Sequence, residues 1–214
     1  MLLAEDLLLL VTDDASGRLS APADRVDAGL GGANLVELTL RNKVDLTGEQ
    51  DPGKPGRIIV RDPSPPGDAI LDRALETVTA YQAKRPSTVI RPLSKNLRRT
   101  LYERLAGHGV VRAERRKVFG AFPSLRWPAQ DASHEAEVRR LMTQALVQQV
   151  APDTRTAALI ALVHAVGCVD KIVDPRQHGL SKRELRARAK KIADGNWASA
   201  AVRKAIEERM ASGG

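Results

Sequence analysis

The sequence predicts a mainly α protein: a single-domain helical bundle with short β-hairpins, one of which protrudes. Only 3% of the 214 residues are aromatic, so the core has to be built from Leu, Val, Ile and Ala, a mixture that favours helices. Apolar residues recur at i, i+3 and i+4 along much of the chain. No linker is long enough to separate domains, and residues 1–214 are therefore expected to form one domain.

The first half of the chain is expected to alternate helices with one short hairpin. Its helices and strands are predicted, in order, at 2–11, 26–41, 44–46, 57–60 and 68–84. The loop between the two strands is rich in Gly and Pro, as hairpin loops are. Gly29, Gly31 and Gly32 are expected to let neighbouring elements approach the second helix closely. Pro86 and Pro92 are expected to bracket a connector.

The second half is expected to be helical apart from one basic hairpin. Ser94 is expected to cap a helix that ends near Gly107. Short strands with a turn through Pro123 then predict a hairpin at about 110–127. Four helices are expected after it. Two lie at 133–150 and 154–168, the third begins at a capping box formed by Ser181 and Glu184, and the fourth follows Asn196.

Charge is unevenly distributed along the chain. Residues 1–90 carry a net charge of −4, residues 91–128 carry +8, and residues 129–214 carry +4, which sum to the total of +8. The basic segment 91–128 therefore holds an excess equal to that of the whole chain. Such a block predicts a polyanionic partner: a nucleic acid, an anionic lipid or an acidic protein surface.

The sequence offers little support for an enzyme. Cys168 is the single cysteine, which excludes a disulfide framework, and the four histidines lack metal-ligand spacing. Cys168 and His164 are one helical turn apart, so a nucleophilic pair is a distant alternative. The segment 48–55 approximates a phosphate-binding loop, but Pro55 replaces the hydroxyl residue that would hold magnesium. We therefore expect no enzymatic activity, no cofactor and no metal.

No membrane-spanning or targeting segment is predicted. No apolar run approaches the ~20 residues that cross a bilayer. The N-terminal apolar run is interrupted by Glu5 and Asp6 and has no basic residue before it, unlike a signal peptide. A cytoplasmic protein is expected.

The basic segment 91–128 supports two functional interpretations. A helix at 94–106 followed by an arginine-rich hairpin is typical of a winged helix, whose wing contacts a nucleic-acid backbone. Alternatively, cations interleaved with Phe119, Phe122 and Trp127 suit the headgroup region of a membrane. A structural alternative is a strand that packs on the core and keeps its charges in solvent.

Four stretches, taken together, resemble the Golgi phosphoprotein 3 family of phosphoinositide-binding proteins. They are LLLL at 7–10, GLGGANLVELTLR at 29–41, PGDAILDRAL at 66–75 and AALIALVHA at 157–165. In order and spacing the resemblance covers residues 2–210. The family fold, a mainly helical domain with a protruding β-hairpin, agrees with the elements predicted above. The chain looks like a compact, prokaryotic-type relative.

The resemblance implies peripheral binding to phosphatidylinositol 4-phosphate through a basic surface pocket. Eukaryotic members line this pocket with an Arg-Asn-Val-Arg run, which Lys95-Asn96-Leu97-Arg98 matches with both cations kept. A further arginine and a tryptophan of that pocket fall at Gly31 and Pro22, so both are lost here. The family also uses its hairpin for contacts between copies.

We therefore expect a non-enzymatic protein that binds an anionic lipid headgroup at the cytoplasmic, inner membrane face. Lys95 and Arg98, at i and i+3, are expected to share one helix face and contact the phosphate, with Arg91 and Arg99 as weaker candidates. No nucleic acid is expected as a partner. The candidates for a membrane or oligomer contact on the hairpin are Arg115, Arg116, Phe119, Phe122 and Trp127.

Overall fold

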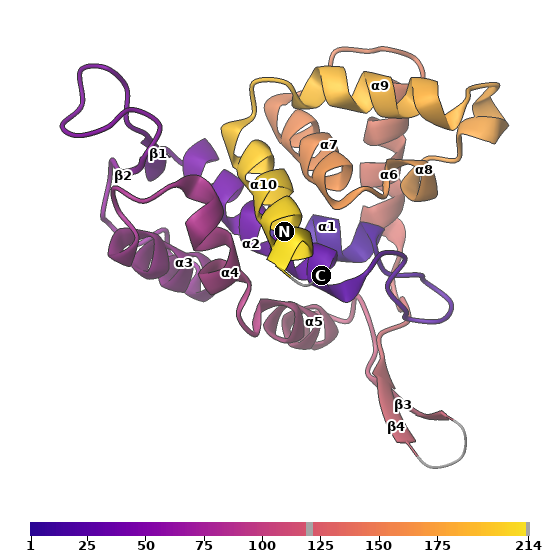
Figure 1. The fold of residues 1–214 in the computed structure, drawn as a ribbon. Helices are drawn as coiled ribbons and strands as arrows, with labels where there is room; N and C mark the ends of the chain where they lie inside the picture. Colours follow the sequence, from indigo (N-terminus) through magenta and orange to yellow (C-terminus); the bar gives the residue numbers. More distant parts are fainter. Residues whose placement is uncertain (119–121, 213–214) are drawn as a thin grey trace.

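The N-terminal helix α1 (Leu3–Leu10) lies in the middle of the molecule and is buried along its whole length (Figure 1). The computed structural model describes residues 1–118 and 122–212. Leu3, Leu7 and Leu8 are fully buried, as expected for a run of leucines with no polar face. Helices α2 (Ala23–Leu40), α5 (Leu97–Gly107), α6 (Ser133–Leu146) and α7 (Thr154–Val166) pack around it. The mainly α class is confirmed.

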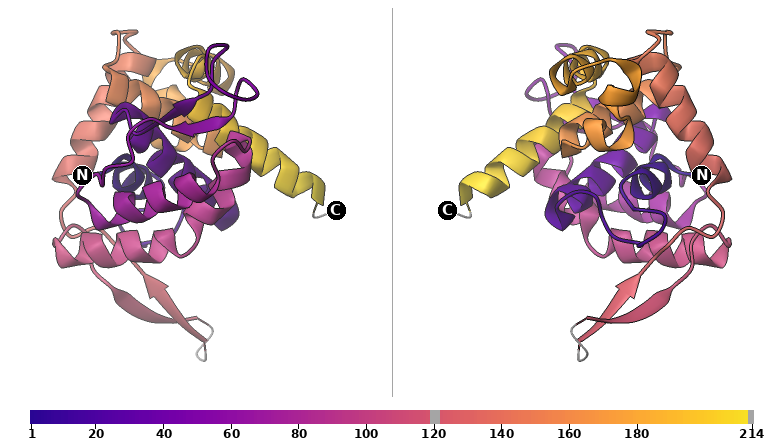
Figure 2. Two further views of the ribbon diagram at one scale, coloured as in Figure 1. Left: turned by 90° about the vertical axis from the view of Figure 1, so that its left-hand side faces the viewer. Right: turned by 90° about the vertical axis from the view of Figure 1, so that its right-hand side faces the viewer.

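The remaining helices complete the bundle. They are α3 (Ala69–Ala80), α4 (Pro86–Ser94), α8 (Val169–Ile172), the 3₁₀ turn η1 (Pro175–His178), α9 (Lys182–Ala193) and α10 (Trp197–Ser212). The predicted capping box at the start of α9 is present, with Ser181 and Glu184 each bonding to the other's backbone amide. Helix α10 packs on α2, α4 and α7 and then extends beyond the body of the molecule (Figure 2).

Three glycines allow three different helices to contact α2 closely. A Cβ atom on Gly29 would lie 2.5 Å from a Val166 methyl of α7, and one on Gly32 would lie 1.9 Å from a Val202 methyl of α10. A Cβ atom on Gly31 would lie 2.6 Å from the carbonyl oxygen of Ile90 in α4. The expected role of these glycines in close approach is confirmed, and it offsets their low helix propensity.

Two sequence expectations about the region before α5 are wrong. Residues 86–94 form helix α4 rather than a connector, because Pro86 occupies the first helical position, where no backbone donor is needed. Pro92 lies inside α4, two residues before its end, and cannot donate the backbone hydrogen bond of its turn. Ser94 does not cap α5: it ends α4, and its hydroxyl donates to the Arg91 carbonyl.

Each of the two hairpins is a two-stranded antiparallel sheet. Strands β1 (Val44–Leu46) and β2 (Ile58–Val60) pair where the sequence predicts them. Strands β3 (Glu114–Val118) and β4 (Phe122–Arg126) form the second hairpin, which protrudes from the body as expected (Figures 1 and 2). The expected turn through Pro123 is wrong, because Pro123 lies within β4 opposite Lys117.

Candidate functional site

The four cations predicted to bind a headgroup lie around the corner between α4 and α5. Lys95 follows the last residue of α4, and Arg98 is the second residue of α5. Asn96, between them, has a left-handed backbone with φ of 60°, so the chain turns there instead of continuing one helix. The expectation that Lys95 and Arg98 share one helix face is therefore wrong.

Arg98 forms an ion pair within the protein. Its Nε lies 3.3 Å from Oδ1 of Asp27 on α2, and both side chains are about one-third exposed, at 32% and 33%. This pair connects α5 to α2. Because Asp27 offsets part of the guanidinium charge, Arg98 is a weaker anion contact than an unpaired arginine at the same place would be.

Lys95 borders a hollow of about 340 Å³ between α2, α3, α4 and α5. Arg73 of α3 is the second cation at this hollow, and none of the described residues that line it is acidic. Asn34 forms part of its floor with a side-chain oxygen that is buried and has no hydrogen-bond partner in the described part of the chain. Sequence reasoning missed Arg73, because only the packing of α3 brings it beside residues 95–100.

Arg91 and Arg99 lie elsewhere. Arg91 borders a separate hollow of about 560 Å³ between α2, α4 and α10, where Asp24, Asp27 and Glu208 also lie. Arg99 is 81% exposed, and its Nε lies 2.7 Å from Glu103 one turn along α5. The four candidate cations therefore do not converge on one point, and Lys95 is the one beside a hollow without carboxylates.

The residues predicted to make a membrane or oligomer contact on the hairpin lie in different surroundings. Trp127 lies at the base of the hairpin, where its ring stacks on Tyr102 with 4.9 Å between ring centroids. Tyr102 is buried, so this stack fastens the hairpin to the body. Arg115 is exposed on β3. Phe119 lies outside the described residues, as do the side chains of Arg116 and Phe122.

The environment of Cys168 does not suit a nucleophile. Cys168 is fully buried, and its thiol donates to the carbonyl of Val163, with a sulfur–oxygen distance of 3.7 Å. Burial raises the pKa of the Cys168 thiol to about 12, so the thiol stays protonated at neutral pH. Burial also lowers the pKa of His164. Neither group carries the charge that an activated thiolate–imidazolium pair would need.

Comparison with known proteins identifies the family. The family profile described as Golgi phosphoprotein 3 (GPP34) matches residues 3–209, nearly the whole chain. The chain belongs to the Golgi phosphoprotein 3 family. This match confirms the resemblance.

A relative within the Golgi phosphoprotein 3 family is vacuolar protein sorting-associated protein 74 of Eremothecium gossypii. It is 26% identical over 223 residues, an alignment that covers 85% of this chain. The chain spans 66% of the length of this relative. Within residues 1–118 and 122–212, no helix is both long and apolar enough to cross a membrane.

Two positions of the family's pocket have different surroundings here. A Cβ atom on Gly31 would lie 2.6 Å from the Ile90 carbonyl oxygen of α4, so the arginine implied by the family resemblance has no room without separating α2 from α4. Pro22, at the position of the family's tryptophan, is the residue before the first turn of α2. The arginine and the tryptophan that the resemblance implies are therefore both absent at these positions.

Proposed function

We propose that this protein is a non-enzymatic peripheral membrane protein that binds phosphatidylinositol 4-phosphate or a related anionic lipid headgroup at the α4–α5 corner. The observation that carries the proposal is the hollow beside Lys95, where Arg73 adds a second cation and no described carboxylate competes. Membership of the Golgi phosphoprotein 3 family supports it. Lys95 and Arg73 donate charge-assisted hydrogen bonds to the headgroup phosphate, and Arg98 adds positive potential from the adjoining turn.

The neighbouring acidic hollow makes Arg98 important to this site. Asp24, Asp27 and Glu208 border that hollow, and Arg98 pairs with Asp27. Without Arg98, the negative potential of these carboxylates extends further toward Lys95 and repels an anionic membrane. Arg98 thus assists binding through the field around the site as well as through any contact with the lipid.

The double variant Lys95→Ala/Arg98→Ala is expected to lose binding to vesicles that contain phosphatidylinositol 4-phosphate. Both side chains are at the surface, so the fold should be retained and the free energy of unfolding should change by less than about 1 kcal/mol. Vesicle co-sedimentation measures the binding, and thermal unfolding checks the fold.

The matched control is Arg140→Ala/Lys191→Ala, which removes the same charge from exposed positions on α6 and α9. It should bind vesicles nearly as well as the wild type. Equal binding by the folded Lys95→Ala/Arg98→Ala variant would refute the proposed site. Binding to duplex DNA with a steep salt dependence, and no binding to vesicles, would instead support the nucleic-acid alternative.

We further propose that the protruding hairpin makes a membrane or self-association contact through Arg115, Arg116, Phe119 and Phe122. Support comes from the strands, which pair with each other and extend away from the helices (Figure 2). Deleting residues 114–126, with Ala113 joined to Trp127 by a short turn, keeps the stack of Trp127 on Tyr102. The variant should unfold cooperatively as a monomer and bind vesicles more weakly. Loss of folding would show instead that the hairpin is structural.

The prokaryotic-type origin and the location at the cytoplasmic, inner face of a membrane stay predictions. Fractionation of cells that produce the protein tests the location. A peripheral protein should leave the membrane fraction in high salt without detergent, because its attachment rests on charge.

A further inference from the structure

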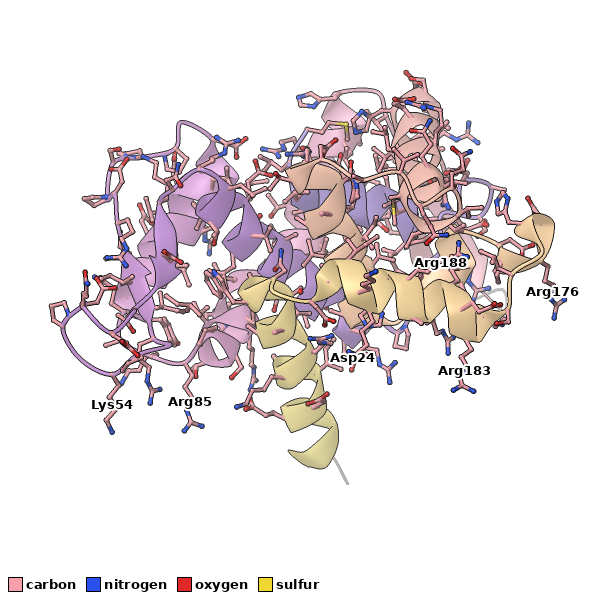
Figure 3. The ribbon with its side chains drawn as sticks, turned by 90° about the horizontal axis from the view of Figure 1, so that it is seen from above. Asp24, Lys54, Arg85, Arg176, Arg183 and Arg188 are labelled. Atoms are coloured by element: carbon pink, nitrogen blue, oxygen red, sulfur yellow. The ribbon has the colours of Figure 1, made fainter. Side chains whose placement is uncertain are left out.

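A second hollow, at the opposite end of α4 from Lys95, is bordered by three cations. It has a volume of about 350 Å³ and lies between the β1–β2 loop, the first turn of α4 and helix α10. Arg57, Arg85 and Lys204 contribute the cations, and Trp197 forms part of the wall. No acidic residue lines it within the described part of the chain. Figure 3 shows Arg85 pointing outward, beside Lys54 on the same edge of the molecule.

These three cations have no partners in the described residues. Arg57, Arg85 and Lys204 form no ion pair and donate no side-chain hydrogen bond to residues 1–118 or 122–212. Many other arginines do have partners: Arg186, for example, lies 2.7 Å from Asp170, and Arg104 lies 2.8 Å from Glu5. Like charges around one concave surface repel each other and raise the local potential, which favours an anion there.

The first turn of α4 adds neutral donors at the same place. Ser87 also lines the hollow and is only 8% exposed, yet neither its hydroxyl nor its backbone amide has a hydrogen-bond partner among the described residues. No side chain caps this helix end. The Ser87 hydroxyl and backbone amide are therefore free to donate hydrogen bonds to an anion at this helix N-terminus.

We propose that this hollow binds a phosphate monoester. Two guanidinium groups and one ammonium group carry three positive charges, enough to neutralise the double negative charge of a phosphate monoester, and can surround its three terminal oxygens. Ser87 supplies two further donors, and the half-buried indole of Trp197 gives the carbon skeleton attached to the phosphate an apolar surface to pack on. The phosphate belongs either to a soluble phosphorylated compound or to a lipid headgroup, and both present the same chemistry to the protein.

This site is separate from the one proposed at the α4–α5 corner. Helix α4 has nine residues, so its two ends are about 13 Å apart. None of Arg57, Arg85 and Lys204 lines the hollow beside Lys95. Variants at one site therefore leave the other intact, and the two proposals can fail independently.

The two tryptophans provide the test. Their indole N–H groups give two signals in a ¹⁵N correlation spectrum, and the spectrum of a Trp127→Phe variant assigns them. On titration with inorganic phosphate at constant ionic strength, the Trp197 signal should move and saturate, while that of Trp127 stays in place. Chloride at the same ionic strength should move neither.

The double variant Arg85→Gln/Lys204→Gln should bind phosphate about tenfold more weakly or worse, since it loses two charged donors. Arg140→Gln/Lys191→Gln, which removes the same charge elsewhere, and Lys95→Ala/Arg98→Ala should bind as the wild type does. A Trp197 signal that does not saturate, or that responds equally in Arg85→Gln/Lys204→Gln and its control, would overturn the proposal.

Vesicles distinguish the two sources of phosphate. If the site binds a lipid headgroup, Arg85→Gln/Lys204→Gln should bind vesicles that contain phosphatidylinositol 4-phosphate more weakly than Arg140→Gln/Lys191→Gln does. If the two variants bind these vesicles equally and the phosphate-dependent shift of Trp197 is confirmed, the site takes a soluble phosphate monoester. Each of these results supports the site and identifies its ligand class.

Discussion

Gly31→Ala is expected to lower the free energy of unfolding by about 2–3 kcal/mol, at the upper end of the usual cost of overpacking. The added methyl carbon would lie 2.6 Å from the carbonyl oxygen of Ile90 and 3.1 Å from the amide nitrogen of Ser94. Both atoms belong to the backbone of α4 and cannot rotate away, so α2 and α4 have to separate. Urea-induced unfolding measures the change.

The control for Gly31→Ala is the same substitution at Gly107. Gly107 is the last residue of α5, and a Cβ atom there would meet no described atom within 4 Å. Alanine has the higher helix propensity, so Gly107→Ala should leave stability unchanged or raise it by up to about 1 kcal/mol. A Gly31→Ala variant as stable as Gly107→Ala would mean that α2 and α4 do not pack as closely as described.

Arg104→Met is expected to destabilise the protein by about 3 kcal/mol, because it leaves a buried carboxylate without its counter-charge. Arg104 donates from Nε to Glu5 at 2.8 Å and from Nη1 to Asp68 at 2.8 Å. Glu5 is 3% exposed and lies at the start of the buried helix α1. Without Arg104, the donor that remains to the Glu5 carboxylate among the described residues is the backbone amide of Leu2. Methionine keeps much of the side-chain volume, so the change isolates the charge.

Arg99→Met, on the same helix, provides the comparison. Arg99 and Glu103 are 81% and 54% exposed, and an ion pair so exposed to solvent should contribute less than about 0.5 kcal/mol. The midpoint of urea unfolding should therefore fall sharply for Arg104→Met and hardly move for Arg99→Met. Similar midpoints for the two variants would show that the Glu5 carboxylate does not depend on Arg104.

Most of the helices could be predicted because their signals are local. The leucine run at 7–10, the apolar pattern at 70–78 and the capping box at Ser181 each specify an element through neighbours in the sequence. Helix α4 was one exception, because its prolines suggested a connector, and the short helix α8 and the turn η1 were not predicted either. Pro86 is compatible with a first helical turn and Pro92 lies near the end, so the helix forms and buries Val89 and Ile90.

The candidate site was harder to predict, because it depends on the backbone conformation of a single residue and on an ion pair between residues far apart in the sequence. The spacing of Lys95 and Arg98 suggests one helix face, but the left-handed backbone of Asn96 divides them between two elements. Asp27, the ion partner of Arg98, lies 71 positions earlier in the chain. No local pattern contains either fact.

By itself, the sequence determined the helical class, the positions of most elements, the uneven charge and the resemblance to the Golgi phosphoprotein 3 family, because periodicity, composition and motif order are properties of the chain. Only the tertiary structure decided which cations share a hollow. Arg57, Arg85 and Lys204 come from the β1–β2 loop, the residue before α4 and helix α10, and Arg73 of α3 likewise joins Lys95. Such groupings follow from how α2 packs against α4, α7 and α10, and that packing depends on glycines whose neighbours are distant along the chain.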